Sequence, residues 1–141
     1  MKALKTILLV FIVVAAQQVS KAAVDGNDEK AVKNVINTYL DAFCHGKLKG
    51  FSQLLDENVK FTTERGDKII TYTKSEMLDA LRKSANVEQN CKTDYSIIEN
   101  LPNQMVVKVN MKYESFTKEN FVTLTESENG WKITHVSTAF K

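Results

Sequence analysis

The sequence of 141 residues predicts an α+β fold, in which three N-terminal helices pack on a strongly curved, mostly antiparallel sheet. Three observations predict it. An apolar repeat of helical period runs through residues 31–46, and two shorter helical patterns follow it. From Cys91 onward the apolar period changes to two, which is typical of antiparallel strands with one buried face. Helices followed by a run of strands favour an α+β architecture over alternating α/β units.

The longest helical pattern is AVKNVINTYLDAFCHG, residues 31–46. Its apolar side chains recur on one helix face, at Val32, Val35, Ile36, Tyr39, Leu40 and Phe43. Asp28 and Glu29 place negative charge at the start of this helix, and Gly46 can adopt the left-handed conformation that ends one. We expect the rest of the chain to cover the apolar face.

Short elements follow in order. Leu48, Phe51, Leu54 and Leu55 have helical spacing and predict a short second helix. Residues 59–63 and 68–72 predict a hairpin around the turn at 65–67. Thr73, with Glu76 three residues later, forms a capping-box pattern that opens a third helix, which ends near Ser84.

Four strands complete the predicted sheet. They cover residues 95–101, 105–113, 119–126 and 131–139. Pro102-Asn103 and Glu128-Asn129-Gly130 supply turns between them, the second a tight hairpin turn. The strand from Met105 to Tyr113 alternates apolar and polar residues most regularly, so we expect one of its faces to be buried.

The N-terminus has the pattern of a secretory signal peptide. Lys2 and Lys5 precede an unbroken apolar run at residues 7–16, and Ser20-Lys21-Ala22 places small residues at a cleavage site. The run is shorter than the roughly 20 apolar residues that span a bilayer. We therefore expect residues 1–22 to be removed and 23–141 to form one domain, periplasmic or secreted, with no membrane association after cleavage. An uncleaved N-terminal anchor is the alternative.

Charge argues against nucleic acid as a partner. Without the three lysines of residues 1–22, the chain carries 16 basic and 17 acidic residues. A nucleic-acid-binding protein usually concentrates basic residues on one surface, and this sequence has no basic run.

The sequence has two cysteines and two histidines, and their number and spacing limit the kinds of site that the chain can form. Cys44 and Cys91 form an even pair, which in an exported protein permits a disulfide, although two buried free thiols fit the count equally well. No spacing typical of metal ligands links them to His45 and His135, so we expect no metal site and no cofactor. No G-x-S-x-G motif indicates a serine nucleophile.

The sequence resembles the nuclear transport factor 2-like (NTF2-like) superfamily, and within it the exported SnoaL-like and putative lumazine-binding proteins of bacteria. The resemblance rests on residues 39–43 with Gly46, on residues 54–59, and on Gly130-Trp131-Lys132-Ile133. It implies a cone-shaped fold with one partly apolar cavity, which the superfamily uses for many functions.

The resemblance also argues against ketosteroid isomerase activity. Tyr39 occupies the place of that enzyme's first-helix tyrosine, which donates a hydrogen bond to the substrate oxyanion. The place of the general base is Thr63, whose hydroxyl has no usable basic form near neutral pH. The second oxyanion donor falls near residues 120–122, where there is no acid.

Two functions stay open. The first is a non-catalytic binding protein for a small molecule, and the second is a small enzyme of polyketide-cyclase or dehydratase type that uses Tyr39 and His135. A cavity filled by its own side chains is a third possibility. The candidate ligand-binding residues come from the first helix, the first strand and the last strand: Tyr39, Phe43, Phe61, Thr63, Trp131, His135 and Ser137.

The last strand carries the remaining expectations. His135 alternates in step with Trp131 and Ser137, so we expect the three to share one face, either lining the cavity or lying at a dimer contact. The resemblance implies a homodimer through the outer sheet face. Apolar residues on the opposite parity support it, at Val122, Leu124, Val136 and Phe140.

Overall fold

A computed structural model describes residues 26–141 of the chain. The predicted signal peptide, residues 1–22, lies outside the described residues, so its cleavage remains a prediction. The elements follow the order that the sequence predicts: two helices, a hairpin, a third helix and four strands. Within the described part of the chain, no helix is both long and apolar enough to cross a membrane.

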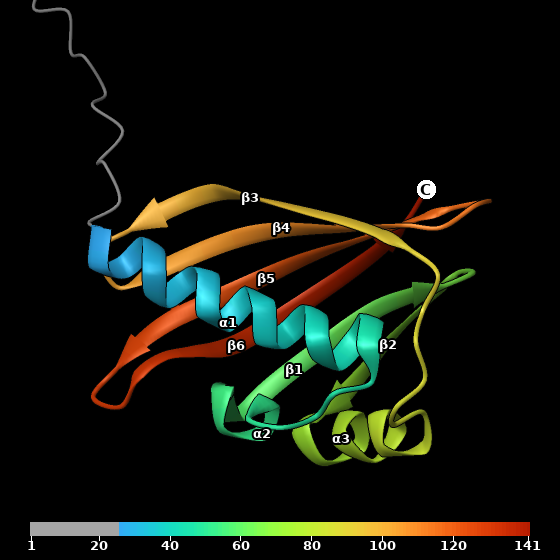
Figure 1. Ribbon diagram of the computed structural model, residues 1–141, viewed down its shortest axis with the longest axis horizontal. Coiled ribbons are helices and arrows are strands. Elements are labelled where there is room, and N and C mark those ends of the chain that lie inside the picture. Colours follow the sequence, from blue (N-terminus) through green and yellow to red (C-terminus); the bar gives the residue numbers. More distant parts are fainter. Residues whose placement is uncertain (1–25) are drawn as a thin grey trace, which may run out of the picture.

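Helix α1 (Gly26–His45) crosses the concave face of the sheet (Figure 1). Its apolar face is buried, and Ile36 and Tyr39 are both 0% exposed. Gly46 ends the helix with φ at 63°, a conformation that glycine adopts without strain. A Cβ at this position would also lie 2.6 Å from the backbone nitrogen of Asn86. The predicted glycine termination is therefore confirmed, and close packing as well as φ requires the glycine.

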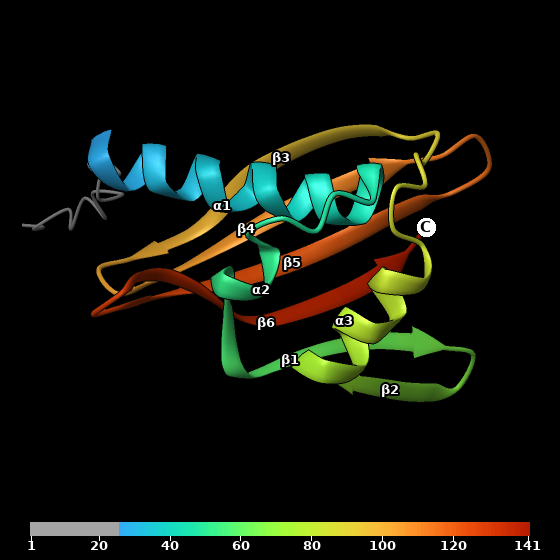
Figure 2. The ribbon, with the colours of Figure 1, turned by 60° about the horizontal axis from the view of Figure 1, so that its bottom comes forward.

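The six strands form one open, curved sheet in the order β2-β1-β6-β5-β4-β3 (Figure 2). All neighbouring strands are antiparallel except β1 and β6, which pair in parallel. The strands are β1 (Leu55–Arg65), β2 (Lys68–Thr73), β3 (Lys92–Leu101), β4 (Gln104–Lys112), β5 (Thr117–Ser127) and β6 (Gly130–Phe140).

The expectation of three N-terminal helices needs correction. Only α1 is long, because α2 (Phe51–Leu54) has four residues and α3 (Lys74–Lys83) follows the β1–β2 hairpin. Leu55, which the helical spacing assigns to the second helix, begins β1 instead. The predicted capping box of α3 is confirmed, since the Thr73 side chain accepts from the Glu76 backbone N–H and the Glu76 carboxylate accepts from the Thr73 N–H.

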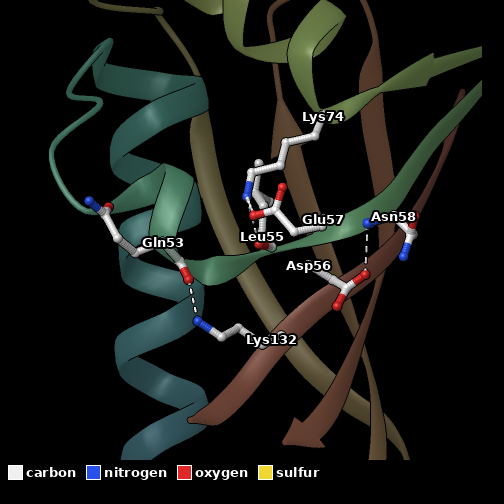
Figure 3. Close-up of polar contacts among 7 residues, drawn as sticks. All are labelled: Gln53, Leu55, Asp56, Glu57, Asn58, Lys74 and Lys132. Atoms are coloured by element: carbon white, nitrogen blue, oxygen red, sulfur yellow. Dashed lines mark hydrogen bonds and ion pairs between the residues drawn. The ribbon is translucent and has the colours of Figure 1, made fainter.

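Two lysines fix the corner where α2 passes into β1 (Figure 3). Lys132 of β6 donates to the carbonyl oxygen of Gln53 at 2.5 Å. Lys74 of α3 donates to the carbonyl oxygen of Leu55 and to Glu57, at 3.1 and 2.6 Å. These contacts satisfy backbone carbonyls that the one-turn helix leaves without intrahelical partners.

A β-bulge in β6 changes which residues face the core. In the pairing of β5 with β6, Leu124 lies opposite Ile133 and Thr123 lies opposite His135, so Thr134 is an extra residue. One extra residue reverses the alternation of side chains along a strand. Trp131 and Ile133 are buried before the bulge, and Val136 is buried after it.

The pairing of β5 with β6, including this bulge, overturns two expectations. His135 and Ser137 do not share the face of Trp131, because the alternation reverses between them. Val122, Leu124 and Val136, which we expected on an outer face, are at most 1% exposed and lie in the core. Of the four apolar residues expected to support a dimer contact, only Phe140 is exposed.

Candidate functional site

A cavity of about 400 Å³ lies between the C-terminal half of α1, the β1–β2 hairpin, α3 and the sheet. This volume is within the range of small-molecule sites in proteins, roughly 300–1,000 Å³. Most of the wall is apolar or aromatic, formed by Tyr39, Phe43, Phe61, Tyr72, Met77, Ala80, Val136 and Phe140. The polar wall residues are Thr62, Thr63, Glu64, Arg65, Lys118 and Thr138.

Aromatic side chains from three elements pack together at the base of the cavity. The ring centroids of Tyr39 and Phe43, one helical turn apart on α1, are 4.5 Å apart. Phe51 contacts both rings edge-on, and Phe61 of β1 lies 6.4 Å from Phe43. Packed rings of this kind give the cavity stiff apolar walls before any ligand binds.

Two buried hydroxyl groups belong to wall residues. Tyr39 Oη and Thr63 Oγ1 are buried and have no hydrogen-bond partner among the described residues. Burial raises the pKa of Tyr39 well above its usual range, so its hydroxyl stays protonated and able to donate. A buried hydroxyl without a partner costs free energy, about 1–3 kcal/mol, and such groups often mark functional sites.

Lys118 is the half-buried cation of the wall. It lies near the start of β5, and its Nζ is 5.0 Å from the centroid of the Phe43 ring. Burial lowers the pKa of this lysine. Lys118 is not among the candidates predicted from sequence. It shares strand parity with Val122 and Leu124, which the sequence pattern placed on the outer face but which are buried.

The candidate residues named from sequence divide into two groups. Tyr39, Phe43, Phe61 and Thr63 line the cavity together. Trp131, His135 and Ser137 are not wall residues. Trp131 is buried at the far end of β6, where its Nε1 donates to Asp28 at 3.4 Å.

His135 does not line the cavity itself, but it contacts the wall residue Thr62 on the neighbouring strand β1. Its Nε2 lies 3.2 Å from Thr62 Oγ1. Its parity on β6 is opposite to that of Val136 and Thr138, which do line the cavity. The place of the family's second oxyanion donor holds Asn120, a buried amide whose Oδ1 accepts from Thr138 Oγ1 at 2.9 Å.

Cys44 and Cys91 lie beside each other near the C-terminal end of α1. Both are free thiols in the structure, with Sγ atoms 3.5 Å apart. Burial and the contact with Cys91 raise the pKa of Cys44 to about 12, so this thiol stays neutral. Among residues 26–141, no group of three or more His, Cys, Asp or Glu side chains is placed to hold a metal ion.

The family comparison covers this whole part of the molecule. Residues 27–141 match the model of a family described as putative lumazine-binding. The chain belongs to this family. The match spans α1, the sheet and every wall residue of the cavity. Among curated proteins, none matches the sequence.

Solved structures described as NTF2-like share the fold of residues 26–141. An NTF2-like protein of unknown function from Silicibacter pomeroyi has a TM-score of 0.70 at 12% identity, covering 82% of this chain and 97% of its own. One from Methylobacillus flagellatus has a TM-score of 0.67 at 16% identity, covering 84% and 95%. A putative aromatic ring hydroxylase from Novosphingobium aromaticivorans has a TM-score of 0.59 at 11% identity, covering 81% and 89%. At these identities the likeness shows the fold alone.

Proposed function

We propose that this member of the putative lumazine-binding family is an exported protein that binds a small, ring-bearing molecule in the cavity beside α1. The observation that carries the proposal is the pair of buried hydroxyls, Tyr39 Oη and Thr63 Oγ1, which belong to the cavity wall and lack partners among the described residues. A ligand oxygen is the partner that we assign to them.

The walls restrict the class of ligand. Phe43, Phe61 and Tyr72 present apolar ring surfaces, which favour a ring over a sugar. Two hydroxyls and one half-buried lysine suit a carbonyl, hydroxyl or single negative charge better than the multiple charges of a sugar phosphate.

The enzymatic alternative loses one of its two groups. Acid–base chemistry with Tyr39 and His135 requires both side chains to reach the same substrate. His135 is not a wall residue, and its parity turns it toward the opposite sheet face. We therefore favour binding without catalysis.

Ligand screening on matched variants tests the proposal. Ring-bearing ketones and phenols that raise the melting temperature of the wild type are titrated into Tyr39→Phe and Thr63→Val. Loss of one hydrogen bond, about 1 kcal/mol, weakens binding about fivefold in each variant. Tyr95→Phe, which removes an exposed hydroxyl on β3, is the control and leaves the affinity unchanged. Equal affinity for the wild type and all three variants would place the ligand elsewhere.

A further inference from the structure

Lys118 differs in its partners from Lys108 and Lys132, the other half-buried lysines of the sheet, whereas the exposed Lys60, Lys68 and Lys92 reach water. Lys108 pairs with Glu119 at 2.7 Å and Lys112 pairs with Asp94 at 2.8 Å. Lys74 and Lys132 are held at the corner shown in Figure 3. Within residues 26–141, no carboxylate lies within ion-pair distance of Lys118.

The neighbours of Lys118 supply little compensation for its charge. Its Nζ lies over the Phe43 ring, an attraction weaker than that of an anion. Cys44 is close enough to interact electrostatically with the ammonium, but its raised pKa keeps it a neutral thiol. Glu119, next along β5, is bound to Lys108 and Lys141. A half-buried ammonium without an anion is costly, and it attracts one.

The surroundings of the ammonium define what would satisfy it. Phe43, the ring beneath Nζ, is also packed against Tyr39, whose hydroxyl has no partner in the described part of the chain. An ammonium and a protonated hydroxyl in one cavity can both donate to the oxygens of a carboxylate, as charge-assisted hydrogen bonds. The apolar walls beyond them suit the ring that carries the carboxylate.

We infer that the ligand of this cavity is a ring-bearing carboxylate, with Lys118 as the residue that recognises its charge. The inference rests on the proposed function and makes it more specific. Without Lys118, the cavity would bind a neutral ring-bearing molecule as tightly as the matching carboxylate. Arg65 is the other cation of the wall, but it is exposed at the end of β1, where water screens its charge.

Matched acid and amide pairs test the inference. Calorimetric titration compares 2-naphthoate with 2-naphthamide, and phenylacetate with phenylacetamide, so only the charge differs within each pair. We expect each acid to bind the wild type at least tenfold more tightly than its amide. In Lys118→Met the acid weakens to the level of the amide, and continued amide binding shows that the cavity is intact. Lys33→Met, the same change of charge on the exposed side of α1, keeps the preference.

Three outcomes would overturn the inference. Equal binding of acid and amide by the wild type would remove the role of charge and leave the proposed function standing; this comparison needs no variant, so it holds even if Lys118→Met does not fold. If the preference for the acid survives Lys118→Met and disappears in Arg65→Gln, then Arg65 and not Lys118 recognises the carboxylate. If the wild type binds neither the acids, the amides nor any compound of the neutral screen, the proposed function fails as well.

Discussion

Lys118 and Glu119 are neighbours on β5, and strand alternation sends their side chains to opposite faces of the sheet. Lys118 points to the cavity and lacks a carboxylate partner among the described residues. Glu119 is 7% exposed and accepts from two lysines, Lys108 and Lys141. We expect the paired charge to stabilise the fold, and we propose that the other charge meets a ligand.

The ion pairs of Glu119 predict that the stability of the protein depends on pH. Its hydrogen bonds from Lys108 and Lys141 hold the pKa of the carboxyl below 4.5, its usual value. A lowered pKa means that the contribution to stability is complete above the usual value and is lost as the pH falls through the folded-state value. We expect Glu119→Gln to be less stable than the wild type at pH 7, with the two melting temperatures converging as the pH falls below 4.5.

Thermal unfolding between pH 3 and 7 measures this convergence. The control is Glu128→Gln, a change at an exposed residue of the β5–β6 turn. If the difference in melting temperature between Glu119→Gln and the wild type stays constant across this pH range, the charge of Glu119 and its ion pairs contribute nothing to stability.

The connection from α3 to β3 is held by contacts with the C-terminal end of α1. The backbone N–H of Asn86 donates to the Gly46 carbonyl at 3.0 Å, and that of Gln89 donates to the Cys44 carbonyl at 2.7 Å. Glu88 pairs with His45 at 2.5 Å. The connection thus supplies partners to the last carbonyls of α1, which the helix itself cannot satisfy.

The cysteine pair at this connection gives the second prediction. The Sγ atoms of Cys44 and Cys91 are 3.5 Å apart, and a disulfide bond of about 2.0 Å needs only a small approach. In exported protein we expect the bond to form, so that alkylation under denaturing, non-reducing conditions labels neither cysteine. By the chain-entropy model, a reductant then lowers the free energy of unfolding by about 4 kcal/mol.

The Cys91→Ser variant provides the control, because reductant should leave its stability unchanged. Two alkylated thiols in wild-type protein recovered from an oxidising compartment would exclude the disulfide.

At the scale of the whole molecule, the two faces of the sheet differ in character. The concave face packs on α1 (Figure 2). The cavity lies on this face. The opposite parity of β4 and β5 carries half-buried apolar residues, Val106 and Phe121, together with the Lys108–Glu119 ion pair. This outer face is more polar than the sequence pattern indicates. Leu124 and Val122 lie opposite the buried Ile133 and Val136, and the bulge at Thr134 returns Val136 to the core.

A homodimer through the outer face remains a prediction, and it now rests on the family resemblance. Sedimentation at micromolar concentration should give twice the mass of residues 23–141. Phe121→Glu places a charge at the centre of this face and should shift the protein to a monomer. Val87→Glu, at an exposed residue of the α3–β3 connection, should stay dimeric. A wild-type protein that sediments only as a monomer would refute the dimer.

The sequence by itself determined the features that depend on neighbours along the chain. The apolar repeat through Val32 and Phe43 predicted α1, and Thr73 with Glu76 predicted the cap of α3. Regular alternation from Met105 to Met111 predicted β4. Residue periodicity reports local geometry, and these elements satisfy it without exception. Periodicity together with the family resemblance identified Tyr39, Phe43 and Phe61 as candidate wall residues, and the resemblance alone pointed to Thr63.

Only the tertiary structure decided the features that depend on strand pairing. The bulge at Thr134 is visible only in the register of β5 against β6. Periodicity therefore placed His135 on the same face as Trp131, which the structure contradicts. Pairing of β1 with β6 turned Leu55 from a helical position into the start of a strand. Lysine is a residue type that usually lies at the surface. Lys118 lines the cavity because the fold places Phe43 of α1 next to its amine. Burial of a charge is a property of the assembled fold, since the groups that surround it come from elements distant in the sequence.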